Sequence, residues 1–383
     1  MKQEMISYLS TCSDDIYELC KYLYNNPENS YKEIKGCKYI SDFLSKYNFN
    51  VENNFLNLAT SFRATKGTGY PKVCFLCEYD AVPGEGHLTG HNLLTATSIS
   101  AALALGKIID KIGGSLILIG CPGEYLGGTK SIMVKQGVFD DIDVVLLAHP
   151  DVVTSESGSS SAIIPLSIKY IGHNGLSFLN KGIYTSLDGI LLTFNILNSL
   201  LKGFPEDVEI NSILSKGGST PLLIPLESEA KFYIRSKEMD VAKIAESKLR
   251  EIAIYVSKLI RVQYSISLYE PENEELITNV VLNRLFSHNL KENGIINIDA
   301  PRDISAGLSL GLVSKTVPCI HPYISIVGDR DIKYGTKEFA ESTISKHAME
   351  QCTKAALSLA FTGYDILTQE TLLSEVKNEF YKK

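Results

Sequence analysis

The sequence lacks the features of nucleic-acid-binding and membrane proteins. It has no arginine-rich stripe, and 44 acidic against 37 basic residues give a formal net charge of -7, which opposes binding to phosphate backbones. The first 20 residues carry acidic side chains throughout and contain no uninterrupted apolar segment, so they predict neither a signal peptide nor a membrane span. We therefore expect a cytoplasmic protein with no nucleic-acid partner and no membrane partner.

A disulfide framework is also missing. The eight cysteines are scattered along the chain, and in a reducing compartment scattered cysteines are free thiols. Cys74 and Cys77 form a CxxC, but they stand inside the β-branched and aromatic run "KVCFLCEYD". A redox pair would instead stand at the start of a helix, where its thiolate is stabilised. The pattern favours a buried strand.

The chain is long enough for two domains, with 383 residues of which 44% are hydrophobic and 21% charged. Strand-like segments at 72–79, 114–122 and 143–150 alternate with helical segments at 92–112 and 128–139. This alternation is typical of an α/β fold with a doubly wound, mainly parallel sheet. Ligands of such sheets bind beyond the carboxyl ends of the strands.

The pattern changes after residue 162. Residues 163–275 follow the order βαββαβ, which predicts an inserted α+β domain of ferredoxin-like type. We therefore expect a discontinuous α/β domain formed by 1–162 and 276–383, interrupted by this insert.

Polar residues stand at the predicted strand ends. The glycine-rich turn "GEGHLTGHN" places His87 and His91 four residues apart, but the position between them where a soft metal ligand would stand is Thr89. Glu124 and His149 follow the next two strands. Each has a structural alternative, because buried histidines are often hydrogen-bonded core residues and a glutamate can cap a helix.

Four separated segments, "NNPENSYKE", "EYDAVPGEGHLTGHNLLTATSISAALAL", "CPGEYLGGTK" and "VSKTVPCIHPYISI", resemble, in this order, motifs of peptidase family M20. The nearest branch is the amidohydrolases that cleave N-acyl or aminobenzoyl amino acids and dipeptides. The resemblance implies an α/β domain with a lid that commonly dimerises, and two divalent ions, usually zinc or manganese, that polarise an amide carbonyl while a glutamate activates water.

Read through this resemblance, three of the family's metal ligands are replaced. The ligand cysteine corresponds to Thr89, a ligand glutamate to Tyr125, and a ligand histidine near the C-terminus to Gly335. A neutral hydroxyl does not bind metal as a thiolate does. His91 and His149 remain as metal ligands.

The same resemblance gives the other site residues. Glu124 corresponds to the family's proton-shuttling glutamate and Asp80 to a residue that orients a ligand, while Tyr125 offers a phenol for acid–base chemistry. We interpret all three as catalytic residues.

In the lid, the resemblance indicates three substrate-binding residues. Arg235 is kept and is a candidate for binding a carboxylate, Asn211 stands where the family has a histidine, and His173 lies three residues before the position of another lid histidine.

Three hypotheses follow. The first is a pseudoenzyme or repurposed metal-free enzyme, without a cofactor, that acts on an amide, acyl or peptide-like ligand. The second is an active metal-dependent amidohydrolase with one zinc or manganese ion in an altered mononuclear site. The third is a structural dimerisation protein. In each we expect a homodimer formed through the lid, and the first also allows a partner enzyme.

Overall fold

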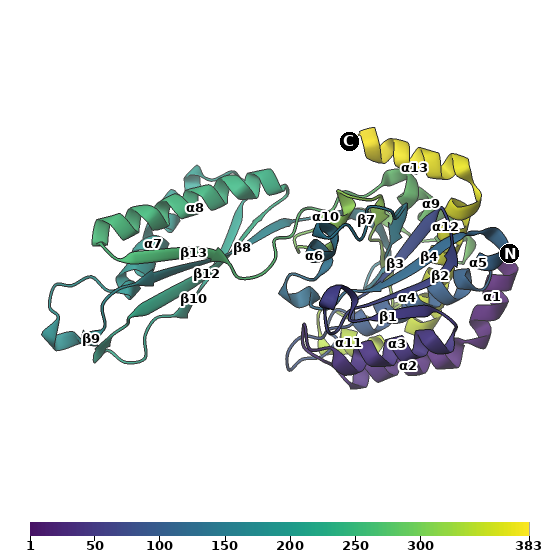
Figure 1. Cartoon of the computed structure of the whole chain (residues 1–383), viewed down its shortest axis with the longest axis horizontal. Coiled ribbons are helices and arrows are strands. Elements are labelled where there is room, and N and C mark those ends of the chain that lie inside the picture. The colour runs from purple at the N-terminus through teal and green to yellow at the C-terminus, as the bar shows by residue number, and fades with distance from the viewer. Residues whose placement is uncertain (383) are drawn as a thin grey trace. The chain divides into compact units, whose positions relative to one another are not determined.

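The computed structural model describes residues 1–382 and forms two compact units (Figure 1). Unit 1 comprises Met1–Ser159, Leu276–Ile304 and the chain from Leu312 onward, and unit 2 comprises Ser160–Glu275 and Ser305–Gly311. The chain therefore enters unit 2 at Ser160 and leaves it after Glu275, and the segment from Ser305 to Gly311 also belongs to unit 2. Within the described residues, no helix is long and apolar enough to cross a membrane.

Unit 1 is built on a mainly parallel sheet, as predicted. Its central strands are continuous apolar runs that are buried on both faces, as parallel strands covered by helices must be. The first two strands in the sheet order are antiparallel to their neighbours and the others run parallel. The order is β1 (Asn50–Asn53), β2 (Phe62–Thr68), β4 (Gly114–Gly120), β3 (Lys72–Cys77), β5 (Val144–Leu146) and β15 (Cys319–Ile320).

A second sheet of unit 1 receives the chain directly after β5. The segment 143–150, expected to be one strand, is split, because the chain leaves the first sheet after Leu146 and begins β6 at His149. This switch places His149 at the start of a strand of the second sheet, three residues after the end of β5. The second sheet has the order β14 (Asp299–Ile304), β7 (Ser155–Ser160), β16 (Tyr323–Ser325) and β6 (His149–Asp151).

Helix α4 (His91–Gly106) forms the centre of unit 1. Every one of its residues is buried, which explains a sequence that is apolar or small on all sides. It packs against β3 and β4 and against helices α2 (Ser13–Asn25) and α12 (Lys346–Thr368). The other helices of unit 1 are α1 (Lys2–Thr11), α3 (Ile34–Lys46), α5 (Ile109–Ile112), α6 (Lys130–Lys135), α9 (Val280–Glu292), α11 (Lys337–Ser342) and α13 (Glu370–Lys382), and α10 (Leu310–Ser314) begins in unit 2 and ends in unit 1.

Unit 2 has the predicted βαββαβ order and a core of its own. Two helices, α7 (Ser186–Leu200) and α8 (Met239–Ile260), pack on one face of an antiparallel sheet (Figure 1). A capping box between Thr185 and Asp188 starts α7. A short pair, β9 (Gly175–Leu176) and β11 (Leu223–Ile224), is added to the expected elements. The sheet order is β10 (Glu209–Lys216), β12 (Glu227–Ser236), β8 (Ala162–Ile171) and β13 (Gln263–Leu268).

Candidate metal centre

Three neighbouring strand ends of unit 1 carry the polar residues of the candidate site. Glu78 directly follows β3, Glu124 opens the short helix η2 (Glu124–Leu126) after β4, and His149 begins β6 shortly after β5. Because β4, β3 and β5 are parallel neighbours, their carboxyl ends lie at the same edge of the sheet.

His91 reaches this edge as the first residue of α4. The preceding residue, Gly90, has a φ of 82°, a value that glycine adopts without strain. A Cβ atom on Gly90 would lie 2.7 Å from Cγ of Pro150, the residue after His149. The turn therefore needs glycine both for its conformation and for its close approach to β6.

Asp80 orients the imidazole of His91. Its Oδ1 lies 2.8 Å from Nδ1 of His91, and its Oδ2 accepts hydrogen bonds from the Ser30 hydroxyl at 2.6 Å and the Tyr125 backbone N–H at 3.0 Å. Burial alone would raise the pKa of Asp80 and lower that of His91. Their mutual hydrogen bond and charge attraction, together with the other hydrogen bonds of Asp80 and the nearby glutamates, outweigh burial and shift both pKa values in the opposite direction. The Nε2 atom of His91 is left to face Glu78.

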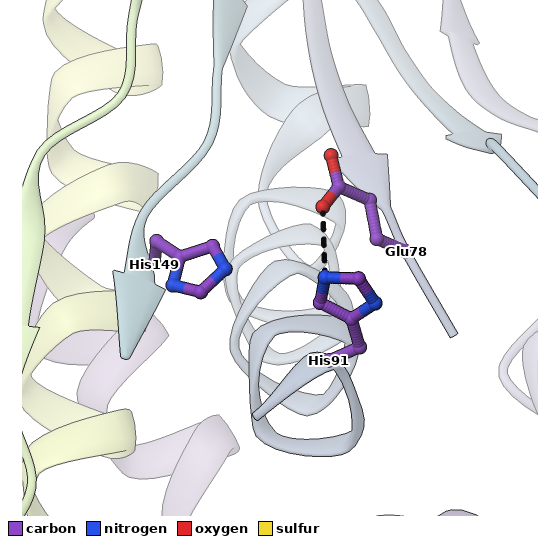
Figure 2. Close-up of side chains that lie close together, drawn as sticks. All are labelled: Glu78, His91 and His149. Atoms are coloured by element: carbon purple, nitrogen blue, oxygen red, sulfur yellow. Dashed lines mark ion pairs between the residues drawn. The ribbon is translucent and has the colours of Figure 1, made fainter. Parts of the chain in front are cut away.

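Glu78, His91 and His149 converge on one point (Figure 2). One ligand atom from each lies within 4.8 Å of the others, and all three residues are buried. Oε2 of Glu78 is 3.6 Å from Nε2 of His91, close to the roughly 3.3 Å between two donors on a tetrahedral zinc ion. Nδ1 of His149 lies 2.8 Å from the carbonyl oxygen of Pro150, so its Nε2 is the nitrogen available to a ligand.

The donor set fits a single catalytic divalent ion. Two imidazoles and one carboxylate are a ligand set of catalytic zinc, which keeps a fourth position open. Each imidazole uses its other nitrogen for a carboxylate or a carbonyl, the usual outer contact of a metal-bound histidine. Burial, followed by the neighbouring His91, lowers the pKa of His149 to about 4, so this imidazole is neutral as a ligand must be.

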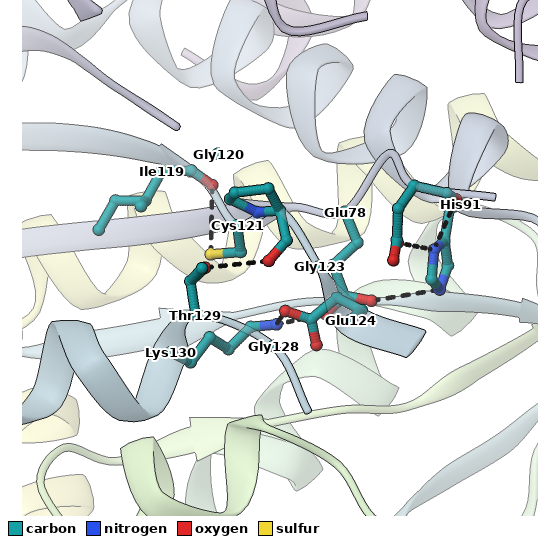
Figure 3. A network of polar contacts seen from close by, with 12 residues as sticks. Glu78, His91, Ile119, Gly120, Cys121, Gly123, Glu124, Gly128, Thr129 and Lys130 are labelled. Atoms are coloured by element: carbon teal, nitrogen blue, oxygen red, sulfur yellow. Dashed lines mark hydrogen bonds and ion pairs between the residues drawn. The ribbon is translucent and has the colours of Figure 1, made fainter. Parts of the chain in front are cut away.

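A fully buried ammonium group lies beside these ligands. Lys130, the first residue of α6, places Nζ 2.6 Å from Oε1 of Glu78 and 2.8 Å from Oε1 of Glu124 (Figure 3). Burial alone would raise the pKa of Glu78, but Lys130 and the histidines outweigh it and lower the pKa to about 2. The lysine therefore links the possible ligand Glu78 to the expected proton shuttle Glu124.

The ring of Tyr125 lies against that of His91. Its ring stacks on the imidazole with centroids 4.8 Å apart and an interplanar angle of 22°. Its hydroxyl makes a hydrogen bond with the hydroxyl of Thr89, so two residues at positions where the resemblance leads one to expect metal ligands pair with each other. Burial raises the pKa of the Tyr125 phenol, which keeps it protonated and able to donate.

Sequence reasoning missed three residues of this region. Glu78 was passed over because the family resemblance assigns it no ligand role, and only its position directly after β3 signals it. Lys130 gives no sequence signal, because its burial depends on the packing of α6. His321 directly precedes Pro322 and by sequence indicates only a turn, but the centroid of its buried ring lies 5.4 Å from that of His149.

His87 does not join the candidate site. Its Nε2 lies 3.0 Å from the carbonyl oxygen of Leu23, so the ring contacts helix α2. The structure brings together Asp80, Glu124, His91 and His149 of the predicted site residues of unit 1, with Tyr125 against His91.

The three predicted substrate-binding residues lie in unit 2. Arg235 on β12 donates a hydrogen bond to the side-chain carbonyl of Asn211 on the neighbouring strand β10. Nη1 of Arg235 also lies 3.9 Å from Oε1 of Glu209. His173 lies exposed in the turn between β8 and β9. The structure thus pairs Arg235 with Asn211.

Two curated relatives match large parts of the chain. The Xaa-Arg dipeptidase of Mus musculus is 28% identical over 404 aligned positions, which cover 99% of this chain and 92% of that protein. A p-aminobenzoyl-glutamate hydrolase component of Escherichia coli K12 is 30% identical over 259 positions, covering 60% of this chain and 54% of that protein. No family model matches the chain.

A solved structure supports the fold. It is a Bacillus subtilis protein described as a dinuclear metal-binding peptidase from the M20 family, with a TM-score of 0.65 and 16% identity. The superposition covers 92% of this chain and 99% of that one.

The prediction that the chain has no cofactor is contradicted. Its structural neighbour is described as metal-binding, and Glu78, His91 and His149 form a group of ligand atoms suited to an ion. The prediction rested on the five metal ligands that the resemblance implies, of which only His91 and His149 are kept, and it left out Glu78. The relatives are named as hydrolases, which favours the second hypothesis, an active hydrolase with an altered site, over the pseudoenzyme.

Proposed function

The chain belongs to peptidase family M20, and from this premise we propose that it is an active, metal-dependent amidohydrolase with one divalent ion at Glu78, His91 and His149. The observation that carries the proposal is the convergence of these three buried side chains within 4.8 Å. Zinc or manganese suits the set, because imidazole and carboxylate are ligands that both ions accept.

The reaction is hydrolysis of an amide bond. When bound, the ion supplies Lewis-acid polarisation of the amide carbonyl and makes a water molecule more acidic. Glu124 accepts the proton of the attacking water and passes it to the leaving amine. Tyr125, which stays protonated beside His91, donates a hydrogen bond to the oxygen on which negative charge develops. Asp80 keeps the ring of His91 in place during these steps.

The substrates we propose are N-acyl amino acids or dipeptides. The names of the relatives describe a dipeptide and an aminobenzoyl amino acid as their substrates, and both kinds of molecule carry a free carboxylate beside the amide. Arg235, paired with Asn211, offers a guanidinium that can bind such a carboxylate in a bidentate manner.

Metal-dependent cleavage tests the proposal. Protein loaded with zinc or manganese is assayed against a panel of N-acetyl amino acids and dipeptides, with and without a chelator. We expect chelator-sensitive cleavage of at least one substrate class. Glu124→Gln is the matched control, since it should keep the metal and lose about 100-fold to 10,000-fold in kcat. Loaded wild-type protein that cleaves none of the panel contradicts the proposal.

The role of Arg235 is tested separately. Arg235→Met should raise KM for a substrate with a free carboxylate at least ten-fold with little change in kcat, because it removes binding that the ground state and the transition state share. The same substrate with its carboxylate amidated should be cleaved equally by both proteins. A fall in kcat for both substrates would assign Arg235 to another role.

We also propose that unit 2 forms a homodimer through β10. This strand is at the edge of its sheet and exposes Ile213 and Leu214 at 61% and 47%. An open edge with apolar side chains is a surface that a second copy can pair with. Ile213→Lys should yield monomers by light scattering, while Tyr255→Lys, which changes an exposed residue of α8, should remain dimeric. Wild-type monomers would contradict this assembly.

A further inference from the structure

Lys130 occupies an unusual place for a lysine. Its side chain is completely buried, and its ammonium group contacts one oxygen of Glu78 and one of Glu124. Glu78 therefore has two different neighbours, because Oε1 faces the ammonium while Oε2 faces Nε2 of His91. A single carboxylate can thus contact Lys130 and an ion between the histidines at the same time.

The charges around the site match one ion rather than two. The carboxylates in contact with Lys130 or His91 are Glu78, Glu124 and Asp80. These three carboxylates carry three negative charges, and the ammonium of Lys130 neutralises one of them. One divalent ion neutralises the two that remain. A second divalent ion would leave two uncompensated positive charges in a buried site, at high desolvation cost.

Donors for a second ion are also missing. The positions where the family resemblance places further ligands hold Thr89, Tyr125 and Gly335, none of which offers an anionic donor. Among residues 1–382, Glu78, His91 and His149 are the one group of three or more histidine, cysteine or acidic ligand atoms close enough to hold an ion. Tyr125 follows Glu124 directly in the chain, at the position where the resemblance places a ligand glutamate, and the ammonium of Lys130 contacts Glu124.

We infer that Lys130 serves as the second cation of the centre, so that each chain binds one divalent ion while the ammonium holds Glu124 in position for water activation. This inference rests on the proposed function. Lys130 is in this account a positioning residue, because it acts through Glu78 and Glu124 and does not itself touch the reacting atoms.

The number of ions per chain tests the inference on the intact protein. Purified protein is loaded with excess zinc, freed of unbound ion by gel filtration, and analysed for zinc by mass spectrometry. We expect one zinc ion per chain together with amide hydrolysis. Two ions per chain with hydrolysis would overturn this inference and leave the proposed function standing. No bound ion and no hydrolysis would overturn both.

The direction of an affinity change tests the role of Lys130 as a charge. Lys130→Met removes a positive charge near the ion, so zinc should bind about ten-fold more tightly or better, while kcat falls because Glu124 is no longer held. Lys130→Arg keeps the charge and should keep the wild-type affinity. Lys135→Met, on the exposed side of the same helix, should change neither quantity.

If Lys130 has only a structural role, Lys130→Met should change the zinc affinity in the opposite direction. Loss of packing support would loosen the ligands, so Lys130→Met would then bind zinc more weakly than wild type, and that result would overturn the inference. If Lys130→Met does not fold, the wild-type ion count still decides the matter.

Discussion

Asp80 is the residue on which the orientation of the site depends. Its carboxylate accepts hydrogen bonds from the hydroxyl of Ser30, which precedes α3, and from the backbone N–H of Tyr125, which follows β4. The same carboxylate fixes Nδ1 of His91. Because every one of these partners is local to the site and the carboxylate is fully buried, its loss affects the metal ligand more directly than the fold.

Asp80→Asn should weaken zinc binding by about 10-fold to 100-fold, the range typical for loss of an outer partner of a metal-bound histidine. The amide keeps the shape of the side chain but removes the charge that supports the imidazole. Competition with a chromophoric chelator measures the affinity, and circular dichroism controls for folding. An unchanged zinc affinity would show that Asp80 does not orient His91.

A second residue, Glu33, makes the free energy of unfolding depend on pH. Its buried carboxylate accepts hydrogen bonds from the backbone N–H groups of Tyr31 and Gly123 and from Thr60. Burial raises its pKa from 4.5 to about 7. Between these two values the native state holds a proton that the unfolded state releases, so stability falls as the pH rises from 4.5 to 7.

Glu33→Gln should remove this dependence. Relative to the variant, the wild type should lose roughly 3 kcal/mol of unfolding free energy between pH 4.5 and pH 7.5, as an order of magnitude. Urea unfolding of both proteins at several pH values provides the measurement. A constant difference between the two proteins across this range would contradict the raised pKa.

At the scale of elements, the turn before α4 brings the segments of two proposed metal ligands, His91 and His149, into contact. Gly90 has positive φ and lies against Pro150, so it controls the distance between His91 and His149. Gly90→Ala should destabilise the protein by about 1–3 kcal/mol and weaken zinc binding. Gly84→Ala is the matched control, because Gly84 also has positive φ, 76°, but no atom within 4 Å of an added Cβ. Equal zinc affinities in the two variants would contradict this role of the turn.

The elements were largely predictable and the site only in part. The alternation of apolar strands with helical segments at 72–150 determines a parallel sheet, and the strand ends direct attention to Glu124 and His149. Glu78 and Lys130 could not be predicted as a pair, because their contact joins the residue after β3 to the first residue of α6, which lie far apart in the sequence. Sequence patterns report periodicity along an element and carry little information on such packing.

At the scale of the whole molecule, each unit has its own apolar core, while the candidate metal centre belongs to unit 1. Zinc should therefore stabilise unit 1, by about 2.7 kcal/mol when its concentration is 100 times Kd. Calorimetry with and without zinc measures the shift, and His149→Ala should remove it. Leu249→Ala, in the core of unit 2, should lower stability by about 2–5 kcal/mol and leave the zinc shift intact. A zinc shift that survives His149→Ala would place the ion elsewhere.

The most direct measurement is an anomalous difference map at the zinc absorption edge from crystals of zinc-loaded protein. We expect one strong peak per chain, coordinated by Oε2 of Glu78 and Nε2 of His91 and His149, with Lys130 still between Glu78 and Glu124. A map with no peak among these three side chains would contradict it.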